Sequence, residues 1–286
     1  MESTISTESI ESHERASYPT HRSSIPKGTL RVGRYALRFA KDEADLEQIQ
    51  RLRFEVFNLE LHEGLESAYA TGLDQDALDL CCHHLMVLAA DTGQVVGTYR
   101  LMTHAMAERH GFYSEAEYDL RTLPREIARE SVELGRACVA KEHRNGRVVQ
   151  LLWRGIARYL AWNDKRYLFG CCSVPTTDPT EARILHRELR ARGVLHESVV
   201  VRPTPAYACP EEEEGALAER LALPPLFESY LRLGAKVLSG PAIDREFKVT
   251  DFFILLDLAE LEPHVRRSFL ERGGWDGERE VTIGTA

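Results

Sequence analysis

The stretch between residues 131 and 170 constrains the fold most, because its apolar pattern changes register partway along a predicted strand. Apolar residues occupy the even-numbered positions as far as Leu134 and the odd-numbered positions from Ala137 onward. A strand has a side-chain period of two, so this slip requires one inserted residue, and Gly135 is a natural site for such a β-bulge. We therefore predict a central strand with a bulge at Gly135–Arg136.

The predicted bulge has consequences for the faces and the edges of this strand. With the register shifted, the side chains of Glu133, Arg136 and Cys138 are expected to point away from the core. The bulge should also splay the strand from its neighbour at Tyr167–Val174 and leave backbone N–H groups unpaired. Such groups can hold the carbonyl oxygen of a thioester.

A basic loop that contains glycine, Lys141–Arg147, separates this strand from an apolar helix that starts near Val148. Free N–H groups and the helix dipole favour an anion at such a helix start, and phosphate is the expected ligand. Between Arg136 and Arg166 there are eight Lys or Arg residues and two Asp or Glu residues, in a chain of net charge -9. An ordinary turn that leads into a solvated helix face is the alternative.

Composition limits the class of protein. A chain of 286 residues that is 43% hydrophobic can bury one large core, and no apolar run reaches the ~18–20 residues of a membrane span. The first 28 residues are polar and lack a signal-peptide core, so we expect a disordered leader over residues 1–28. The cysteines include two adjacent pairs and have no metal-ligand spacing, which favours a reducing cytoplasm and predicts no metal site. The acidic balance argues against general nucleic-acid binding.

Hydrophobic periodicity predicts a mixed α/β (α+β) protein with mostly antiparallel strands around one strand–helix–strand unit. Strands are expected over residues 30–39, 84–90, 95–103, 131–140, 167–174, 197–201, 236–238 and 252–258. Helices are expected over residues 42–57, 148–160, 179–192, 226–234 and 264–271, with Asp42 and Asp178 as N-caps. We expect one domain over residues 29–260 with an acidic loop at 203–225, followed by a helix and tail over 261–286.

The basic loop resembles a known phosphate-binding motif. The pattern V-x4-R-x-G-x-V-x2-L-L, from Val139 to Leu152, is similar to the pyrophosphate loop of acyltransferases with the GNAT fold. Gly146 is the only glycine in it, whereas that family's loop has a second glycine or an alanine. The resemblance therefore implies a donor with one phosphate and no nucleotide, such as the phosphopantetheine arm of acyl carrier protein. Arg144, Gly146 and Arg147 are the candidate residues for this arm or for the acidic surface of the carrier.

Blocks spread over residues 35–260 resemble one family more closely. Four are similar to signature positions of the acyl-homoserine-lactone synthases, namely Arg53-x3-Phe57, Asp76-x2-Asp79, Gly97–Arg100 and Glu133–Arg136. The similarity is closer still to the ornithine-acyl-carrier-protein N-acyltransferases, which also have the GNAT fold. Segments of that family appear at Gly97–Leu101, Gly111–Leu120, Glu133–Val139, Leu151–Ala157, Tyr167–Cys171 and Gly240–Phe247.

The resemblance implies an enzyme that transfers a 3-hydroxyacyl chain from acyl carrier protein to the α-amino group of L-ornithine, giving lyso-ornithine lipid. It implies a GNAT-like sheet with a bulged, splayed central strand flanked by helices. It also implies no permanently bound cofactor, the acyl-phosphopantetheine of the carrier as co-substrate, and a cytoplasmic enzyme with peripheral contact to the inner membrane. Two alternatives stay open: acylation of another amine, such as glycine or a homoserine-lactone-type acceptor, and a non-catalytic module that binds an acylated carrier or a lipid.

The block at Glu133–Arg136 supplies the candidate catalytic residues, Glu133 and Arg136. An amine must lose a proton to attack a thioester, and Glu133 beside the bulge is the candidate base. Backbone N–H groups near the bulge are the candidate oxyanion donors. The alternative is an exposed strand glutamate that pairs with Arg136.

The other signature positions supply the candidate acceptor-binding residues, which are Arg53, Phe57, Asp76, Asp79 and Arg100. The two aspartates are expected to hold the cationic amines of the acceptor, and Arg53 or Arg100 its carboxylate. Helix capping and turn formation are the alternative for the aspartates, and a solvent-facing side chain is the alternative for Arg100.

Two further residue groups suggest other chemistry. Cys138 near His143 would suit a thiol nucleophile, but a cysteine within an apolar strand is usually part of the core. His83 and His84 have no partner at metal-ligand spacing, so structural histidines are expected. The chain lacks GxSxG and His-x4-Asp, which argues against serine hydrolases and glycerolipid O-acyltransferases.

Overall fold

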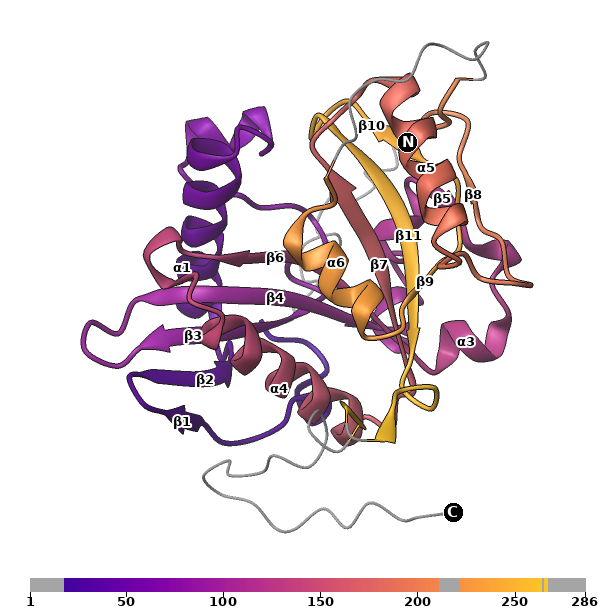
Figure 1. Ribbon diagram of the computed structural model, residues 1–286. Coiled ribbons are helices and arrows are strands. Elements are labelled where there is room, and N and C mark those ends of the chain that lie inside the picture. Colours follow the sequence, from indigo (N-terminus) through magenta and orange to yellow (C-terminus); the bar gives the residue numbers. More distant parts are fainter. Residues whose placement is uncertain (1–17, 211–221, 264, 267–286) are drawn as a thin grey trace, which may run out of the picture.

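The computed structural model of the protein describes residues 18–210, 222–263 and 265–266. Within these residues a sheet of nine strands runs through the molecule, with helices on both of its faces (Figure 1). Its strand order is β1-β2-β3-β4-β6-β7-β11-β10, and β9 also pairs with β11. The β6–β7 pair is parallel, and the other ladders are antiparallel. The predicted mixed, mostly antiparallel sheet is confirmed.

The strands of this sheet are β1 (Leu30–Val32), β2 (Tyr35–Phe39), β3 (His83–Ala89), β4 (Val95–Thr103), β6 (Ser131–Val139), β7 (Tyr167–Val174), β9 (Lys236–Val237), β10 (Ala242–Asp244) and β11 (Val249–Asp257). A separate ladder joins β5 (Tyr118–Asp119) to β8 (Arg202–Pro203). The helices are α1 (Glu43–Arg53), α2 (His104–Ala107), α3 (Arg125–Arg129), α4 (Arg147–Trp162), α5 (Pro179–Ala191) and α6 (Pro225–Arg232). A π-helical segment, η2 (Phe54–Glu60), continues α1. Among the helices of the described residues, none combines the length and apolarity needed to cross a membrane.

Strand β6 contains the predicted bulge. Thr98 of β4 is opposite Cys138, whereas Arg100 is opposite Gly135, so β6 has one extra residue between these two pairs. The residue in the left-handed region is Arg136, with a φ of 50°, rather than Gly135. A side chain other than glycine is uncommon in this conformation and is held there by its surroundings.

Strands β6 and β7 pair at one end and separate at the other. Their parallel pairing is limited to residues 131–133 and 167–169. Beyond this point β7 continues along β11, while residues 135–137 of β6 are only half-buried. A cavity of about 20 Å³ lies in the fork, lined by Leu134 of β6 and by residues 168–172 of β7 among others. The predicted splay of the central strand is confirmed, and we call the open part between residues 135–137 and 171–173 the cleft.

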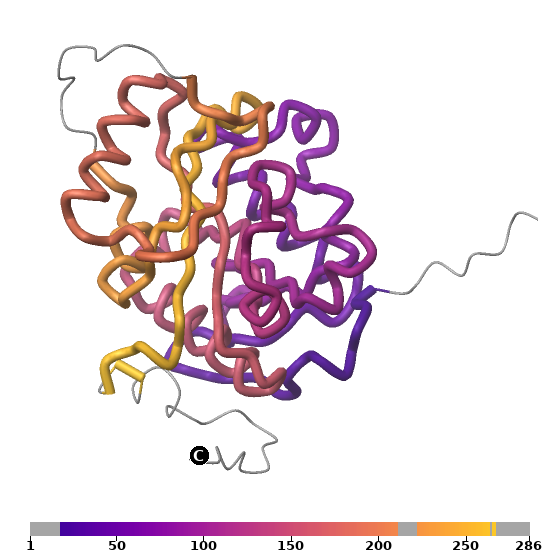
Figure 2. The backbone as a smooth tube through the Cα atoms, turned by 90° about the vertical axis from the view of Figure 1, so that its right-hand side faces the viewer, coloured from indigo at the N-terminus to yellow at the C-terminus, as the bar shows by residue number. Residues whose placement is uncertain are grey.

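Helices α1 and α4 cover opposite faces of the sheet. A Cβ at Gly155 of α4 would lie 2.4 Å from Leu85 of β3, so this glycine allows α4 to pack closely. Ile49 of α1 packs on Met86, the next residue of β3, whose side chain points to the other face. Helices α5 and α6 lie on the α4 face, over β7 and β11. The excursion between β4 and β6, drawn in magenta in Figure 2, covers the other face beside the C-terminal strands.

Both predicted helix caps are confirmed. The Asp42 carboxylate accepts a hydrogen bond from Asp45 N at 2.9 Å at the start of α1. The Asp178 carboxylate accepts one from Thr180 N at 2.7 Å, and Pro179 is the first residue of α5. In both cases a side-chain oxygen accepts a hydrogen bond from a backbone N–H group of the first turn that has no acceptor within the helix.

Two predicted strands were wrong, and one strand near the cleft was missed. The single strand expected over residues 30–39 is a hairpin, because the chain turns at Gly33, where φ is 56°. The strand expected over residues 197–201 is irregular apart from an isolated bridge between Val201 and Ser239. Strand β10, which pairs with β11 near the cleft, was not predicted.

The N-terminal boundary also differs from the prediction. Residues 18–28 are part of the fold rather than of a disordered leader, since Tyr18 is buried with its hydroxyl 2.9 Å from His84 Nδ1. Three other predicted segments lie wholly or largely outside the described residues: the leader over 1–17, the middle of the acidic loop at 211–221, and the helix over 264–271 with the tail.

Gly170, at the fork, is expected to tolerate no side chain. A Cβ there would lie 2.4 Å from the carbonyl oxygen of Leu134, so β6 and β7 would have to move apart. We expect Gly170→Ala to lower the free energy of unfolding by ~1–3 kcal/mol in urea denaturation. Gly240→Ala is the matched control, because a Cβ at that position meets no atom of the described residues within 4 Å. Equal stability of the two variants would contradict this explanation of the fork.

Candidate active site

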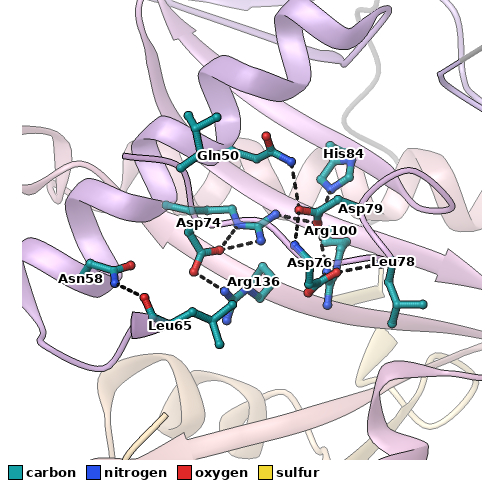
Figure 3. A network of polar contacts seen from close by, with 12 residues as sticks. Gln50, Asn58, Leu65, Asp74, Asp76, Leu78, Asp79, His84, Arg100 and Arg136 are labelled. Carbon is teal, nitrogen blue, oxygen red and sulfur yellow. Dashed lines mark hydrogen bonds and ion pairs between the residues drawn. The ribbon is translucent and has the colours of Figure 1, made fainter. Parts of the chain in front are cut away.

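Three arginines and three aspartates form one network where the α1 face of the sheet meets the bulge (Figure 3). The arginines come from α1, β4 and β6, and the aspartates from the loop that precedes β3. The members are Arg53, Arg100, Arg136, Asp74, Asp76 and Asp79. Arg53, Arg100, Asp74 and Asp79 are buried, and the equal number of positive and negative groups makes this burial tolerable.

Arg53 is the centre of this network. Its side chain is fully buried, Nε donates to Asp74 Oδ1 at 2.7 Å, and Nη1 donates to Asp79 Oδ1 at 2.8 Å. Burial opposes the charged guanidinium, but the two carboxylates raise the pKa of Arg53 above its usual value. Burial likewise opposes ionisation of Asp79, yet Arg53 and its other partners hold the pKa of Asp79 well below its usual range.

Arg100 extends the network toward the cleft. Its Nη1 donates to Asp76 Oδ2 at 2.6 Å and to Asp79 Oδ1 at 3.0 Å. Its guanidinium carbon lies 5.2 Å from the centre of the Tyr113 ring. Arg100 is 3% exposed, so the alternative of a solvent-facing side chain is wrong.

Arg136, at the bulge, lies between two aromatic rings. Its guanidinium carbon is 5.1 Å from the Phe57 ring centre and 4.8 Å from that of Phe247, and it forms an ion pair with Asp74. These contacts hold its unusual backbone conformation. Within the described residues, Nε of Arg136 and Nη2 of Arg100 are buried without a hydrogen-bond partner, so both can bind an anion.

The predicted acceptor contacts of Asp76 and Asp79 stay predictions. Asp79 already has four side-chain partners in the protein, which are Gln50, Arg53, His84 and Arg100. Asp76 accepts from Leu78 N at 2.9 Å, so turn formation is one of its roles. Asp74, which lies in the same loop, was not predicted, although three aspartates within six positions were a visible signal.

Glu133 lies on the sheet face that the excursion covers. Its carboxylate accepts hydrogen bonds from Tyr113 N and Ser114 N, each at 2.8 Å, and from the Ser114 hydroxyl. Burial raises the pKa of Glu133, and these hydrogen bonds oppose that rise. The expectation of a side chain pointing away from the core is wrong, because this face is itself buried, and so is the alternative of a pair with Arg136. Its role as a base stays a prediction.

A second group of acidic residues, which the sequence analysis missed, lies beyond Ser114. A carboxylate oxygen of Glu117, a carboxylate oxygen of Asp251 and the sulfur of Cys171 all lie within 4.8 Å of one another. The Cys171 thiol is 3.6 Å from Ser114 Oγ, which connects this group to Glu133. Burial and repulsion from Asp251 raise the pKa of Glu117 to about 10, and burial raises the pKa of Asp251 to about 7.

The basic loop lies at the surface, at the start of α4. Gly146 has a φ of 81° and directly precedes Arg147, the first residue of the helix. Arg144 is engaged within the protein, with Nη2 2.7 Å from Glu60 Oε2 and Nε donating to Val139 O at 3.0 Å. Contacts of this loop with phosphopantetheine stay predictions, and the geometry favours the exposed Arg147 over Arg144.

A groove of about 790 Å³ runs beside the basic loop. It is lined by the β1–β2 turn, the first half of α4, the end of α6 and Val265. The charged residues that line it are all arginines, namely Arg34, Arg147, Arg154 and Arg232. Its positive charge, in a protein of net charge -9, suits an acidic partner.

The alternative chemistries find no support in the geometry. Cys138 packs against α1, and burial raises the pKa of its thiol to about 12, which disfavours a thiol nucleophile. His143 Nδ1 instead lies 3.0 Å from the Tyr35 hydroxyl. The expected structural role of His83 is confirmed, since its two ring nitrogens are each 2.8 Å from a partner, the Tyr159 hydroxyl and a backbone carbonyl.

A comparison with protein families identifies the class. The model of the acetyltransferase (GNAT) domain matches residues 52–154, the segment that contains the bulged strand, the basic loop and the start of α4. The chain is therefore an acyltransferase of the GNAT class. Among solved structures, the acyl-homoserine-lactone synthase LasI superposes with a TM-score of 0.46 at 14% identity, over 86% of this chain and 98% of that one.

Individual relatives identify the family. The L-ornithine N(alpha)-acyltransferase of Brucella abortus (strain 2308) is 36% identical over 251 residues, which cover 81% of this chain and 87% of that protein. The enzyme of the same name from Rhizobium meliloti (strain 1021) is 35% identical over 81% of this chain and 82% of its own length. The enzyme of the same name from Rhodobacter capsulatus is 32% identical, over 83% of this chain and 95% of its own length. The chain belongs to the L-ornithine N(alpha)-acyltransferase family, as the resemblance predicted.

Removal of Arg53 is expected to destabilise the protein strongly. Arg53→Ala leaves the buried carboxylates of Asp74 and Asp79 without their main partner, which should cost about 3–5 kcal/mol of unfolding free energy. Arg51→Ala is the matched control from the same helix, because its pair with Glu47 is exposed and should contribute less than about 0.5 kcal/mol. Chemical denaturation measures the unfolding free energy of both variants. A small loss for Arg53→Ala would show that the network contributes little to stability.

Glu117 is expected to make stability depend on pH. Its pKa is about 10 in the folded protein and 4.5 ordinarily, so between these values the folded state binds a proton that the unfolded state lacks. Its contribution to stability is thus present below pH 4.5 and lost as pH rises toward 10. Glu117→Gln imitates the protonated form and should gain stability relative to wild type, by roughly 1 kcal/mol or more, between about pH 5 and pH 8. A stability difference between the two proteins that does not change with pH would contradict the shift.

Proposed function

We propose that this protein transfers a 3-hydroxyacyl chain from acyl carrier protein to the α-amino group of L-ornithine. The observation that carries the proposal is its identity of 32–36%, over at least 81% of the chain, with relatives named L-ornithine N(alpha)-acyltransferase. The product would be lyso-ornithine lipid. A cytoplasmic enzyme that touches the membrane peripherally to release this amphiphile fits the proposal.

The cleft supplies a plausible arrangement for acyl transfer. The neutral α-amine attacks the thioester carbon, the carbonyl oxygen becomes an oxyanion, and the thiolate then leaves and takes up a proton. A bulge leaves one residue outside the ladder, so the N–H groups of Arg136 and Ala137 are suitable oxyanion donors. The Arg136 guanidinium adds positive charge at the same place.

Glu133 would accept the proton of the amine through Ser114. The carboxylate is buried, and the Ser114 hydroxyl that donates to it also contacts Cys171 of β7. A proton passed from the amine to this hydroxyl can therefore continue to Glu133 without exposing the carboxylate. Burial raises the pKa of Glu133 above that of an ordinary glutamate, which strengthens it as a base.

The arginine-lined groove supports a carrier protein as donor. Long-range repulsion opposes the encounter of an acidic carrier with a chain of net charge -9, so docking requires a local positive surface. The groove offers one beside Gly146 and the N-terminus of α4, where the phosphate of the pantetheine arm would lie.

Glu133→Gln is expected to lower turnover by roughly 10²–10⁴, because an amide cannot take up the proton. Glu115→Gln is the matched control: its carboxylate accepts from Phe112 N at 3.2 Å and stabilises the same turn, but it is exposed and faces no reacting group in the proposal. Turnover is measured at saturating donor and acceptor, with thermal unfolding as a check on folding. Near-wild-type turnover of Glu133→Gln would remove this residue from the mechanism.

The proposed function is tested by offering purified enzyme a panel of amines with three donors, and reading the products by mass spectrometry. We expect 3-hydroxyacyl-carrier protein with L-ornithine to react fastest, and Arg147→Glu to raise the KM for the carrier. Arg147→Glu should raise the KM for an acyl-pantetheine donor by less. The control is Arg125→Glu, which changes an exposed arginine on α3 and should leave the KM for both donors unchanged. Preference for glycine or another amine would refute ornithine as acceptor, and equal use of acyl-CoA would refute the carrier as donor.

A further inference from the structure

The acidic group at the cleft has the properties of a cation site. Glu117 is 2% exposed, and its Oε2 has no hydrogen-bond partner within the part of the chain that the structure describes. Asp251 of β11 is 3% exposed and accepts from the Ser173 hydroxyl at 2.7 Å. Without a cation, burial and the neighbouring carboxylates therefore favour the protonated form of Glu117, whereas a bound cation would stabilise its ionised form and remove the cost of burying that charge.

The surroundings add further negative charge. Besides burial, the groups that raise the pKa of Glu117 are Asp251, Asp244 and Glu133, and Glu63 acts in the same direction on Asp251. The tyrosines that face this group are Tyr113, Tyr118 and Tyr207, and burial raises the pKa of each. The Cys171 thiol also has a pKa well above its usual value, because of burial and then Glu117, so it stays protonated. The acceptor of the proposed function supplies such a cation, the ammonium group of its side chain.

The opposite side of the site offers hydrogen-bond donors, and its positive and negative groups are equal in number. Arg100 stacks on Tyr113, and Arg136 beside it retains an unpartnered Nε among the described residues. Tyr113 is within electrostatic reach of both sides, namely of Arg136, Glu117 and Asp251. A ligand that spans Tyr113 would need an anionic and a cationic end.

The carboxylate pair can be reached from the cleft. Ser173, which donates to Asp251, is exposed, and Cys171 is half-buried. Both residues lie on the part of β7 that has separated from β6. The donor thioester, if held at the bulge, would therefore be adjacent to a bound acceptor.

We propose that Glu117 and Asp251 bind the side-chain ammonium of the acceptor amino acid while Arg136 binds its α-carboxylate, and that this pair makes the enzyme select a dibasic amino acid. The inference rests on the proposed function, and it moves the ammonium site from Asp76 and Asp79 to the other wall of the cleft. The α-amine is then left between the two walls, next to Ser114 and Glu133, where it must lose its proton.

The test compares L-ornithine with L-norvaline, which has the same carbon skeleton without the side-chain amine. Asp251→Asn and Glu117→Gln should lower kcat/KM for ornithine about 100-fold and leave that for norvaline within about threefold. Asp45→Asn is the matched control: it removes another buried carboxylate, on α1 and paired with Arg38 of β2, and should not change the ratio of kcat/KM for ornithine to kcat/KM for norvaline. Ser173→Ala removes only the hydroxyl that donates to Asp251. It should therefore reduce the preference for ornithine over norvaline by less than Asp251→Asn does.

Binding measured without donor separates the two claims. Calorimetric titration of the wild-type protein should show ornithine binding at least 10-fold tighter than norvaline, and nearly equal affinities in Asp251→Asn. Equal affinities in wild type, or equal losses of both substrates in the variants, would overturn the inference even if ornithine is acylated. Stoichiometric metal in the wild-type protein that is absent from Asp251→Asn would also overturn it. Acylation of a different amine, with ornithine still bound more tightly, would refute the proposed function and leave the cation site standing.

Discussion

The buried contact of Arg53 with Asp74 and Asp79 is the interaction on which the rest of this structure depends. It ties α1 to the loop before β3, and through Asp79 and Asp74 it reaches Arg100 on β4 and Arg136 at the bulge of β6. A balanced set of buried charges is close to neutral for stability, whereas loss of one partner is expensive. The network therefore specifies a single arrangement, in which a non-glycine residue occupies the left-handed position and the cleft stays open.

Charge separation across the cleft follows from this arrangement. The network places two arginines with unpartnered N–H groups on one wall, and β7, β11 and the excursion place carboxylates on the other. Buried groups of this kind act in a low dielectric, where an unmatched end of a ligand is strongly rejected. Selection of the acceptor would thus come from the excursion and the last strands, while the basic loop and the groove serve the donor.

The local patterns of the sequence predicted the parts of the fold that depend on neighbouring residues. The shift of the apolar pattern by one residue after Leu134 predicted the bulge, and Asp42 and Asp178 predicted helix starts. These predictions were correct because the signals act within a few residues. Gly33 was misread because apolar residues alternate on both sides of it, and one glycine in such a run fits either a strand or a turn.

The site was predicted only in part, because its geometry is tertiary. The signature positions located Arg53, Arg100, Arg136 and Asp79, but only the fold shows that they bind one another. Glu117 and Asp251 are brought together by the pairing of β7 with β11 and by an excursion that no local pattern defines. The burial of Glu133 likewise depends on residues 113 and 114, which approach it from outside its own strand.

A crystal structure of the enzyme with its N-acyl-ornithine product would test the central claim most directly. The claim is that the two walls of the cleft hold the two ends of the acceptor, and that the bulge holds the carbonyl oxygen of the donor. The structure should then show the product carboxylate within hydrogen-bond distance of Arg136, the side-chain ammonium between Glu117 and Asp251, and the amide oxygen at the bulge. A product whose ammonium contacts Asp76 instead, or whose amide oxygen lies away from the bulge, would contradict it.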